Sequence, residues 1–212
     1  MFQVQCLNST SNKVTEFYSK YLIGPFLKGQ STTVGNALRR VLLSNLQGLS
    51  IIGVRIIGID HEFSTIPNVK EDVVDILLNL KQIVLKGNIT EPTFARLSVK
   101  EGGIIVANNI DLPSNITLVD PNQYIASLTS QGNLEMEFLI AQGQNYFTNK
   151  KLDYAIPEQF LAVDAVFMPV TKVNFFVEVS PKSSSFELES LTLEIWTNGS
   201  MIPDDALGLS AE

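Results

Sequence analysis

The 212-residue sequence predicts an α+β protein whose sheets are mostly antiparallel. Two stretches place apolar residues at three- and four-residue steps, which is the spacing of amphipathic helices. Around them lie short alternating segments separated by turn residues, which is the pattern of antiparallel strands and hairpins. No internal repeat is evident, so the chain is assigned to the α+β class with two main helices.

The first predicted helix follows a strand and a turn. Residues 13–27 mix aromatic and charged residues, which is typical of a strand, and they end shortly after a Gly-Pro turn signal. Residues 34–46 carry apolar side chains at helical spacing. Thr32 or Thr33 is the expected N-cap of this helix, and Gly48 is its expected terminator.

The second predicted helix has the strongest local pattern in the sequence. It follows a β-branched, mostly buried strand over residues 50–59 and a polar loop over residues 61–68. Apolar residues then recur at three- and four-residue steps over residues 69–84. Acidic residues crowd its first turns and lysines its end, as the helix dipole favours, and Gly87 is the expected stop.

The rest of the chain is predicted to be β-structure. Short strands are expected at residues 95–99, 103–107, 115–119, 123–129 and 134–140. Residues 143–151 are polar and basic and predict an exposed loop. A hairpin is expected from strands at residues 172–179 and 186–196 joined by residues 180–185, and a change of alternation at Ser190 predicts a bulge.

The composition is unusually apolar for a chain that must stay dissolved. Charged residues make up 17%, the mean hydropathy is +0.17 and the net charge is −7. Either the core is large or part of the surface is covered by other chains.

No apolar run approaches the ~20 residues of a membrane span, so no membrane contact is expected. The single cysteine, Cys6, excludes an internal disulfide and a cysteine zinc site, and the single histidine, His61, excludes multi-histidine metal centres.

No catalytic constellation emerges from the motifs. His61 stands outside an H-E-x-x-H pattern, and no G-x-S-x-G elbow supplies a nucleophile. The glycine-containing loop 29–36 lacks the lysine of a phosphate-binding loop. The acidic pairs Glu71-Asp72 and Asp204-Asp205 could bind Mg²⁺, but at a helix start they more simply complement the helix dipole. The residues by themselves therefore indicate a scaffold or a binding module.

The charge is uneven along the chain. Residues 1–50 carry five basic residues against one acidic residue, a net charge of +4. Such asymmetry can accompany nucleic-acid contact. However, the basic residues are scattered without any run, so the footprint is thin and no direct contact with nucleic acid is expected.

Three segments carry patterns specific enough to indicate a family. Residues 29–44 read GQSTTVGNALRRVLLS, residues 61–81 read HEFSTIPNVKEDVVDILLNLK and residues 193–206 read LEIWTNGSMIPDDA. In order and spacing they resemble the G-x-G-x-T-[LV]-G-N-A-L-R-R block, the H-E-[FY]-S-T block with its following E-D-[IV] helix, and the strand-to-helix junction of the bacterial RNA polymerase α subunit. The opening Phe2–Cys6 and the Thr32-Thr33 pair look most like cyanobacterial and plastid versions.

The resemblance implies a two-domain, amino-terminal assembly platform. A discontinuous dimerisation domain would comprise residues 1–51 and 168–212, with an inserted β-rich domain at residues 52–167. The chain would be a non-catalytic subunit of a nucleotidyltransferase, forming a homodimer that nucleates binding of the β and β′ subunits. Catalysis belongs to β′, so no catalytic residue and no cofactor are expected on this chain, with Mg and Zn on other subunits. The implied location is the plastid stroma or the cyanobacterial cytoplasm.

The resemblance also assigns two sets of contact residues. For contact with the large subunits it implies Arg40 and Leu43 on the first helix, His61, Glu62, Phe63 and Ser64 in the loop, and Lys70, Glu71 and Asp72 at the start of the second helix. For the dimer interface it implies the apolar face of the first helix, with Val34, Leu38, Val41 and Leu42.

The sequence departs from the family pattern in three places. Ser31 replaces the second glycine of the first block. Residues 142–146 lack the family's usual arginines, which removes the basis for a contact carried by that loop. Beyond Ala206 the family continues into a long helix of the dimer interface and a DNA-binding domain, whereas this sequence ends at Glu212. No DNA contact is therefore expected from this segment, and dimerisation is expected to be weaker.

Two hypotheses from other classes stay open at this point. One is a free-standing enzyme that uses His61 and nearby carboxylates. The other is a dimeric binding protein for small ligands, which predicts a stable dimer without a large partner.

Overall fold

The structure is a computed structural model that describes residues 3–13, 16–129, 132–147, 156–180 and 188–211. Contacts divide the chain into two compact units. Unit 1 comprises Met1–Leu46 and Met168–Glu212, and unit 2 comprises Gln47–Phe167. The junction thus lies at the start of a strand, whereas the sequence placed a boundary between residues 51 and 52, within that strand.

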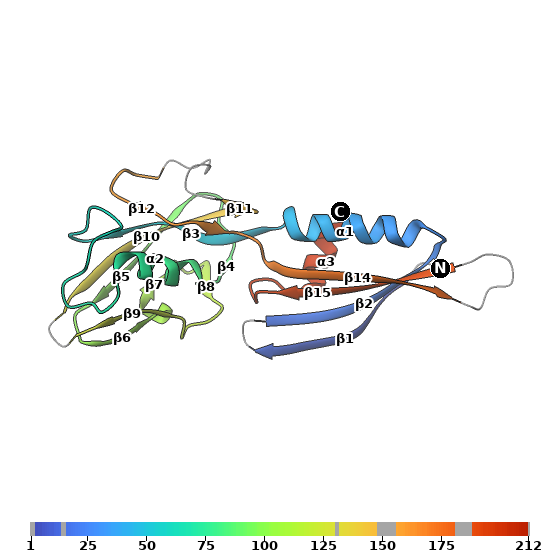
Figure 1. Ribbon diagram of the computed structural model, residues 1–212, viewed down its shortest axis with the longest axis horizontal. Coiled ribbons are helices and arrows are strands. Elements are labelled where there is room, and N and C mark those ends of the chain that lie inside the picture. The colour runs from blue at the N-terminus through green and yellow to red at the C-terminus, as the bar shows by residue number, and fades with distance from the viewer. Residues whose placement is uncertain (1–2, 14–15, 130–131, 148–155, 181–187, 212) are drawn as a thin grey trace. The chain divides into compact units, whose positions relative to one another are not determined.

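Unit 1 is a four-stranded antiparallel sheet with two helices packed against it. Its elements are β1 (Gln3–Lys13), β2 (Glu16–Leu27), α1 (Gln30–Ser44), β14 (Val170–Ser180), β15 (Leu188–Thr197) and α3 (Pro203–Ala211). The strand order is β1-β2-β15-β14, and α1 runs along the sheet (Figure 1). The pairing of β14 with β15 confirms the predicted hairpin, and the register shift beside Ser190 confirms the predicted bulge. The connecting residues 181–187 lie outside the described residues.

The first helix is held by packing rather than by its own ends. One face of α1 buries Ser31, Gly35 and Leu42 against the strands of unit 1. A Cβ on Gly35 would come within 2.7 Å of the Phe175 ring, so the glycine lets the helix approach the sheet closely. Short helices are marginal in water, so this apolar face supplies most of the stability of α1.

The start of α1 differs from the expectation of a threonine N-cap, which is wrong. The helix begins at Gln30, its N-cap is Gly29 in a left-handed conformation, and no side chain of the helix caps it. Instead the Gly29 N–H donates to Oε2 of Glu189 at 3.0 Å. Glu189 is 7% exposed and comes from β15, beside the bulge. A buried carboxylate at the positive end of the helix dipole stabilises the start of the helix. Only the tertiary structure brings Glu189 to this position.

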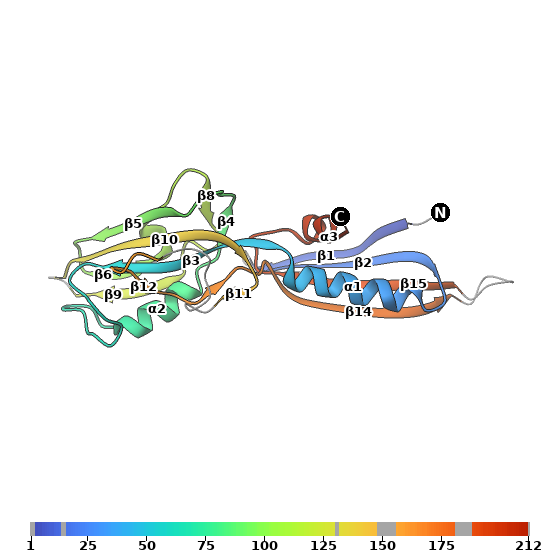
Figure 2. The same cartoon turned by 90° about the horizontal axis from the view of Figure 1, so that it is seen from above.

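Unit 2 is built on a seven-stranded sheet. The sheet contains β3 (Gln47–Ile56), β4 (Leu85–Gly87), β5 (Thr93–Val99), β7 (Ile110–Asp111), β8 (Ile116–Leu118), β10 (Leu134–Gln144) and β12 (Leu161–Ala162). Two smaller pairs are β6 (Gly103–Val106) with β9 (Tyr124–Leu128), and β11 (Tyr146–Phe147) with β13 (Ala165–Val166). A 3₁₀ turn (Ala107–Asn109) and α2 (Val73–Lys81) complete the unit. The long antiparallel neighbours β3 and β10 lie side by side at its centre (Figure 2).

The core of unit 2 follows the alternation along β10. Met136, Phe138 and Ile140 are at most 1% exposed and face α2 and its neighbours, whereas Glu135 and Glu137 point to the other face. Every predicted strand between residues 95 and 140 is present, some with ends shifted by a few residues. Period-two alternation is a reliable signal where one face of a strand is buried. Strands that the sequence did not predict are β4 and the two-residue strands β7, β11, β12 and β13, which are too short to show a period. The longer strand β1 was also missed, since residues 3–10 are exposed and no buried face imposes an alternation on them.

The second helix is shorter than the apolar spacing predicts. It spans Val73–Lys81 rather than residues 69–84, because residues before it pair with β9 and residues after it lead into β4. Lys81 does occupy the last turn, but Asp75 alone of the acidic residues lies in the first turn. Gly87 is not its stop and belongs to β4.

Gly48 has a different role from the predicted helix terminator. Helix α1 ends at Ser44, where the Asn45 N–H donates to the Val41 carbonyl at 2.8 Å. Gly48 lies in β3 opposite Gly143 of β10, and Phe167 crosses over this glycine pair. A Cβ on Gly48 would collide with the Phe167 carbonyl oxygen, and one on Gly143 would lie 2.9 Å from the Phe167 ring.

Replacement of Gly48 by alanine is therefore expected to destabilise the protein by about 2 kcal/mol or more, because a backbone atom rather than a movable side chain must give way. The measurement is the free energy of unfolding in urea. The matched control is Gly208→Ala in α3, where a Cβ meets nothing within 4 Å and helix propensity favours alanine by up to about 1 kcal/mol. Equal stability of Gly48→Ala and wild type would contradict the crossing.

Candidate functional site

One hollow of unit 2 lies between α2 and the chain around β12. Its volume is about 290 Å³. The residues that line it are Glu62, Phe63, Val74, Leu77, Leu78, Lys81, Ala162, Val163 and Asp164, which we call the α2 groove. Within it the side chains of Phe63 and Leu78 are 82% and 54% exposed. An apolar surface of this kind, rimmed by charged groups, is typical of a place where another protein binds.

At one end of the α2 groove the charged side chains are paired with each other. The Lys81 ammonium donates to the Tyr146 hydroxyl at 3.1 Å and lies 3.5 Å from Oδ2 of Asp164. The same hydroxyl donates to Asp164 at 2.8 Å, and the ammonium lies 4.9 Å from the centre of the tyrosine ring. The hydrogen bond to Tyr146, with the nearby Asp164 carboxylate, raises the pKa of Lys81 against the opposing effect of burial. The charges at this end are therefore fixed to one another.

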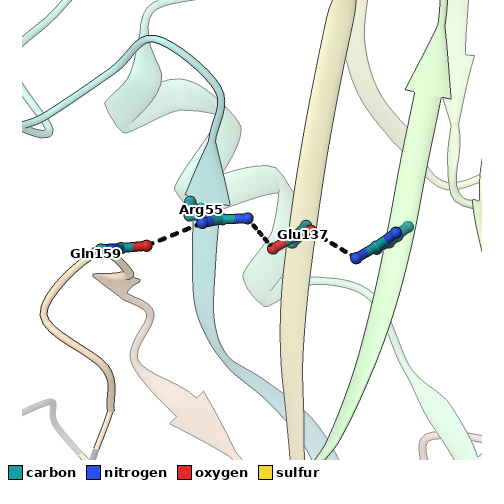
Figure 3. A network of polar contacts seen from close by, with 4 residues as sticks. Arg55, Glu137 and Gln159 are labelled. Carbon is teal, nitrogen blue, oxygen red and sulfur yellow. Dashed lines mark hydrogen bonds and ion pairs between the residues drawn. The ribbon is translucent and has the colours of Figure 1, made fainter.

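A polar ladder supports the wall of the groove that carries Ala162 and Asp164. Glu137 on β10 stands opposite Arg55 on β3 and Arg96 on β5 in the strand register, and it accepts from them at 2.5 and 3.1 Å. Arg55 also donates to Gln159 at 2.9 Å, as Figure 3 shows. This bond fixes the chain just before β12, which pairs with β3 and leads into the groove wall.

The predicted contact loop is present and lies on the surface. His61, Glu62 and Phe63 are exposed, and Glu62 and Phe63 line the α2 groove. The Ser64 hydroxyl lies 2.9 Å from Nδ1 of His61. In the part of the chain that the structure describes, no carboxylate forms a hydrogen bond that would orient this imidazole. The arrangement therefore lacks the orienting group of a catalytic triad.

The three residues predicted at the start of α2 have separate environments. Lys70 and Asp72 are exposed, and Asp72 occupies the N-cap position without a side-chain capping bond. Glu71 is half-buried, and its carboxylate accepts hydrogen bonds from the Tyr124 hydroxyl and from the Ser127 amide, the latter at 2.7 Å. Burial opposes ionisation, but these hydrogen bonds and the charge of Lys70 outweigh it, so the pKa of Glu71 lies below its ordinary value of 4.5.

The residues predicted on the first helix fall on different sides of it. Val34, Leu38 and Val41 are half-buried and follow one flank at three- and four-residue steps, and Val34 and Leu38 also pack partly against the core of unit 1. Arg40 is exposed on another side, and Leu43 packs partly against the core of unit 1. Leu42 is 1% exposed and belongs to that core, so its side chain is not available at a surface.

Other chemistry considered from the sequence finds no support in the geometry. At the glycine-containing loop, the Glu189 carboxylate occupies the position at the Gly29 N–H that an anion would need. Asp204 accepts from the Tyr21 hydroxyl at 2.5 Å. Among the described residues no group of three or more His, Cys, Asp or Glu side chains is placed to hold a metal ion. No helix in that part of the chain has the length and apolar character of a membrane span.

Several groove residues escaped the sequence analysis. Val74 and Leu78 lie four residues apart on the outward face of α2, and an apolar pair on that face was the available signal. Val163 and Asp164 in the lining, and Tyr146 beside Lys81 at its end, gave no signal, since the pairing of short strands brings them there.

The chain is similar to known proteins over its whole length. A family model described as the RNA polymerase Rpb3/RpoA insert domain matches residues 54–168. The chain is 54% identical over 212 residues to the DNA-directed RNA polymerase subunit alpha of Emiliania huxleyi, covering all of this chain and 69% of that protein. It is 46% identical to the subunit of Rhodomonas salina, covering 97% and 66%, and 44% identical to that of Trichormus variabilis, covering 99% and 67%. The chain thus spans about two thirds of the length of these relatives.

The environment of Glu71 predicts a pH-dependent stability. A carboxylate with a lowered pKa stabilises the folded state fully above its unfolded value of 4.5, and this contribution disappears as the pH falls through the folded value. Glu71→Gln is expected to lower the free energy of unfolding by about 1 kcal/mol at neutral pH, with a smaller difference below pH 4.5. Urea unfolding at both pH values measures this. The exposed neighbour Glu62→Gln is the control, and a difference for Glu71→Gln that grows in acid would refute the assignment.

Proposed function

The chain belongs to the family of DNA-directed RNA polymerase α subunits, and from that membership we propose that it is the non-catalytic assembly subunit of its polymerase. As a family member it is part of a nucleotidyltransferase complex that transcribes DNA into RNA. The proposal is that the chain dimerises and that the dimer nucleates binding of the β and β′ subunits. The single observation that carries it is the exposed apolar α2 groove, which contains part of the predicted large-subunit contact set.

The α2 groove supports binding of a large subunit because its apolar residues are exposed while its Lys81 and Asp164 charges are already paired. Leu78 and Val74 are 54% and 39% exposed on the outward face of α2. Burial of such side chains under a partner would contribute roughly 25 cal/mol per Å² of apolar surface. Lys81 is already paired with the Asp164 carboxylate, so a partner that binds here need not supply a carboxylate for it.

The partly buried flank of α1 supports dimerisation. Val34, Leu38 and Val41 leave part of their apolar surface uncovered along one line of the helix. A two-fold dimer places the same patch of each copy against its mate, so a single self-complementary flank is sufficient for such an interface. Arg40 lies on another side of the same helix, which leaves it available for a large subunit when the flank is covered.

Two further parts of the proposal concern cofactors and location. We propose that this chain holds no cofactor, and that the metals of the polymerase reside on its other subunits. The relatives come from algae such as Emiliania huxleyi and from cyanobacteria such as Trichormus variabilis. The proposed location is accordingly the plastid stroma or the cyanobacterial cytoplasm.

Co-expression with β and β′ tests the assembly role. The wild-type chain is expected to copurify with the large subunits, and Leu78→Glu is expected to reduce recovery at least tenfold, because a buried unpaired carboxylate costs more than about 1.4 kcal/mol. Ile104→Glu is the matched control, since Ile104 is 71% exposed on β6 and does not line the groove. Recovery of wild type as free chain alone would overturn the proposal, and equal losses in both variants would remove the groove from it.

Dimerisation is tested separately on the isolated chain. Val41→Asp places a carboxylate on the proposed interface flank and is expected to weaken self-association at least tenfold in sedimentation equilibrium. Asn36→Asp adds the same charge at an exposed position elsewhere on α1 and serves as the control. A wild-type chain that stays monomeric at all accessible concentrations would overturn this part alone.

A further inference from the structure

A short backbone ladder anchors the far end of the contact loop to β9. The Thr129 N–H donates to the Asn68 carbonyl at 2.9 Å, and the Lys70 N–H donates to the Ser127 carbonyl at 3.1 Å. Val69 and Leu128 form the bridge between these bonds. The chain that follows the loop is therefore held as an additional strand segment before α2 begins.

Glu71 extends this ladder with its side chain at the point where the backbone turns away. The Ser127 N–H donates to Oε2 at 2.7 Å, and the Tyr124 hydroxyl donates to Oε1. Both backbone groups of Ser127 are thus bound by neighbouring residues. Its carbonyl accepts from the backbone N–H of Lys70, and its N–H donates to the side chain of Glu71. Both oxygens of the Glu71 carboxylate therefore accept hydrogen bonds from residues of unit 2. The Tyr124 hydroxyl also lies 2.5 Å from Oγ of Ser127.

The loop presents its apolar tip without support from packing of that tip. Phe63 is 82% exposed, whereas the residues that fix the loop lie after it. Ile66 is buried, the Val73 N–H donates to the Ser64 carbonyl at 3.4 Å, and Thr65 bridges Asp72. Binding of a partner restricts the motion of the loop, which costs conformational entropy. A loop that is already held in its bound conformation lowers this cost.

We propose that Glu71 is a positioning residue, which clamps the start of α2 to β9 and thereby holds residues 61–67 in the conformation that a large subunit binds, without touching that subunit itself. The proposal rests on the proposed function and changes the role that the family resemblance implied, which was direct contact. It assigns the same role to Tyr124, which lies on β9 and does not line the α2 groove.

Tyr124→Phe separates positioning from contact, because it deletes the hydroxyl that donates to Glu71 and keeps the ring. Tyr18→Phe is the matched control, since the Tyr18 hydroxyl donates to the Glu194 carboxylate at 3.0 Å in unit 1. Glu71→Gln is the second variant. The first readout is amide hydrogen exchange over residues 61–70 in the free chain.

Exchange in this segment is expected to rise about fivefold in Tyr124→Phe and in Glu71→Gln, the change that loss of one hydrogen bond produces, and to stay unchanged in Tyr18→Phe. Unchanged exchange in both unit 2 variants overturns the clamp. Because this readout needs no partner, it is independent of whether the chain binds the large subunits.

The second readout is a double-mutant cycle with Phe63→Ala, measured as the dissociation constant of the complex with β or with β′. Tyr124→Phe is expected to weaken binding about fivefold in the wild-type background and to have almost no effect once Phe63→Ala has removed the tip. Additive effects overturn the positioning role. A wild-type chain that binds neither subunit overturns the proposed function instead, while the exchange result still decides the clamp.

Discussion

The long antiparallel pairing of β3 with β10 is the interaction on which unit 2 depends. Its central positions bury one face of both strands in the core under α2, while the other face carries Arg55 and Glu137 directly opposite one another. At its end the facing glycines Gly48 and Gly143 leave the space that Phe167 occupies. A single register thus determines the core, the polar ladder and the crossing. A slip by one residue would move the side chains of a strand to the opposite face of the sheet, and it would separate Arg55 from Glu137 and Gly48 from Gly143.

The candidate binding surface is a consequence of this pairing. Arg55 holds Gln159, β12 pairs with β3, and the chain beyond β12 forms one wall of the α2 groove. The opposite wall is the outward face of α2, whose inward face is fixed in the same core. Because Lys81 and Asp164 are paired with each other, the exposed surface that remains between the walls is mainly apolar. A surface of that kind favours a protein partner over a charged small ligand.

The excess of apolar residues now has a physical interpretation. Much of it lies in three buried clusters, one in unit 1 and two in unit 2, and therefore needs no partner. The exposed remainder includes Phe63 and Leu78 at the groove, with the partly covered flank of α1 in the other unit. Membership of a family of polymerase subunits accounts for such surface, because a subunit of a larger complex presents apolar patches to other chains.

The sequence by itself determined the α+β class, both main helices, the alternating strands from residue 95 to 140, the final hairpin with its bulge, and the family. These features have a local signature, since a period of two or 3.6 residues or a motif of fixed spacing is visible within a short window. The tertiary structure alone decided the buried capping of α1 by Glu189, the crossing of Phe167 over Gly48, the inward direction of the Glu71 carboxylate and the place of Tyr146 beside Lys81. Each of these joins residues far apart along the chain, and their side-chain types are compatible with several environments. Only the folding of the strands into one register selects the partner.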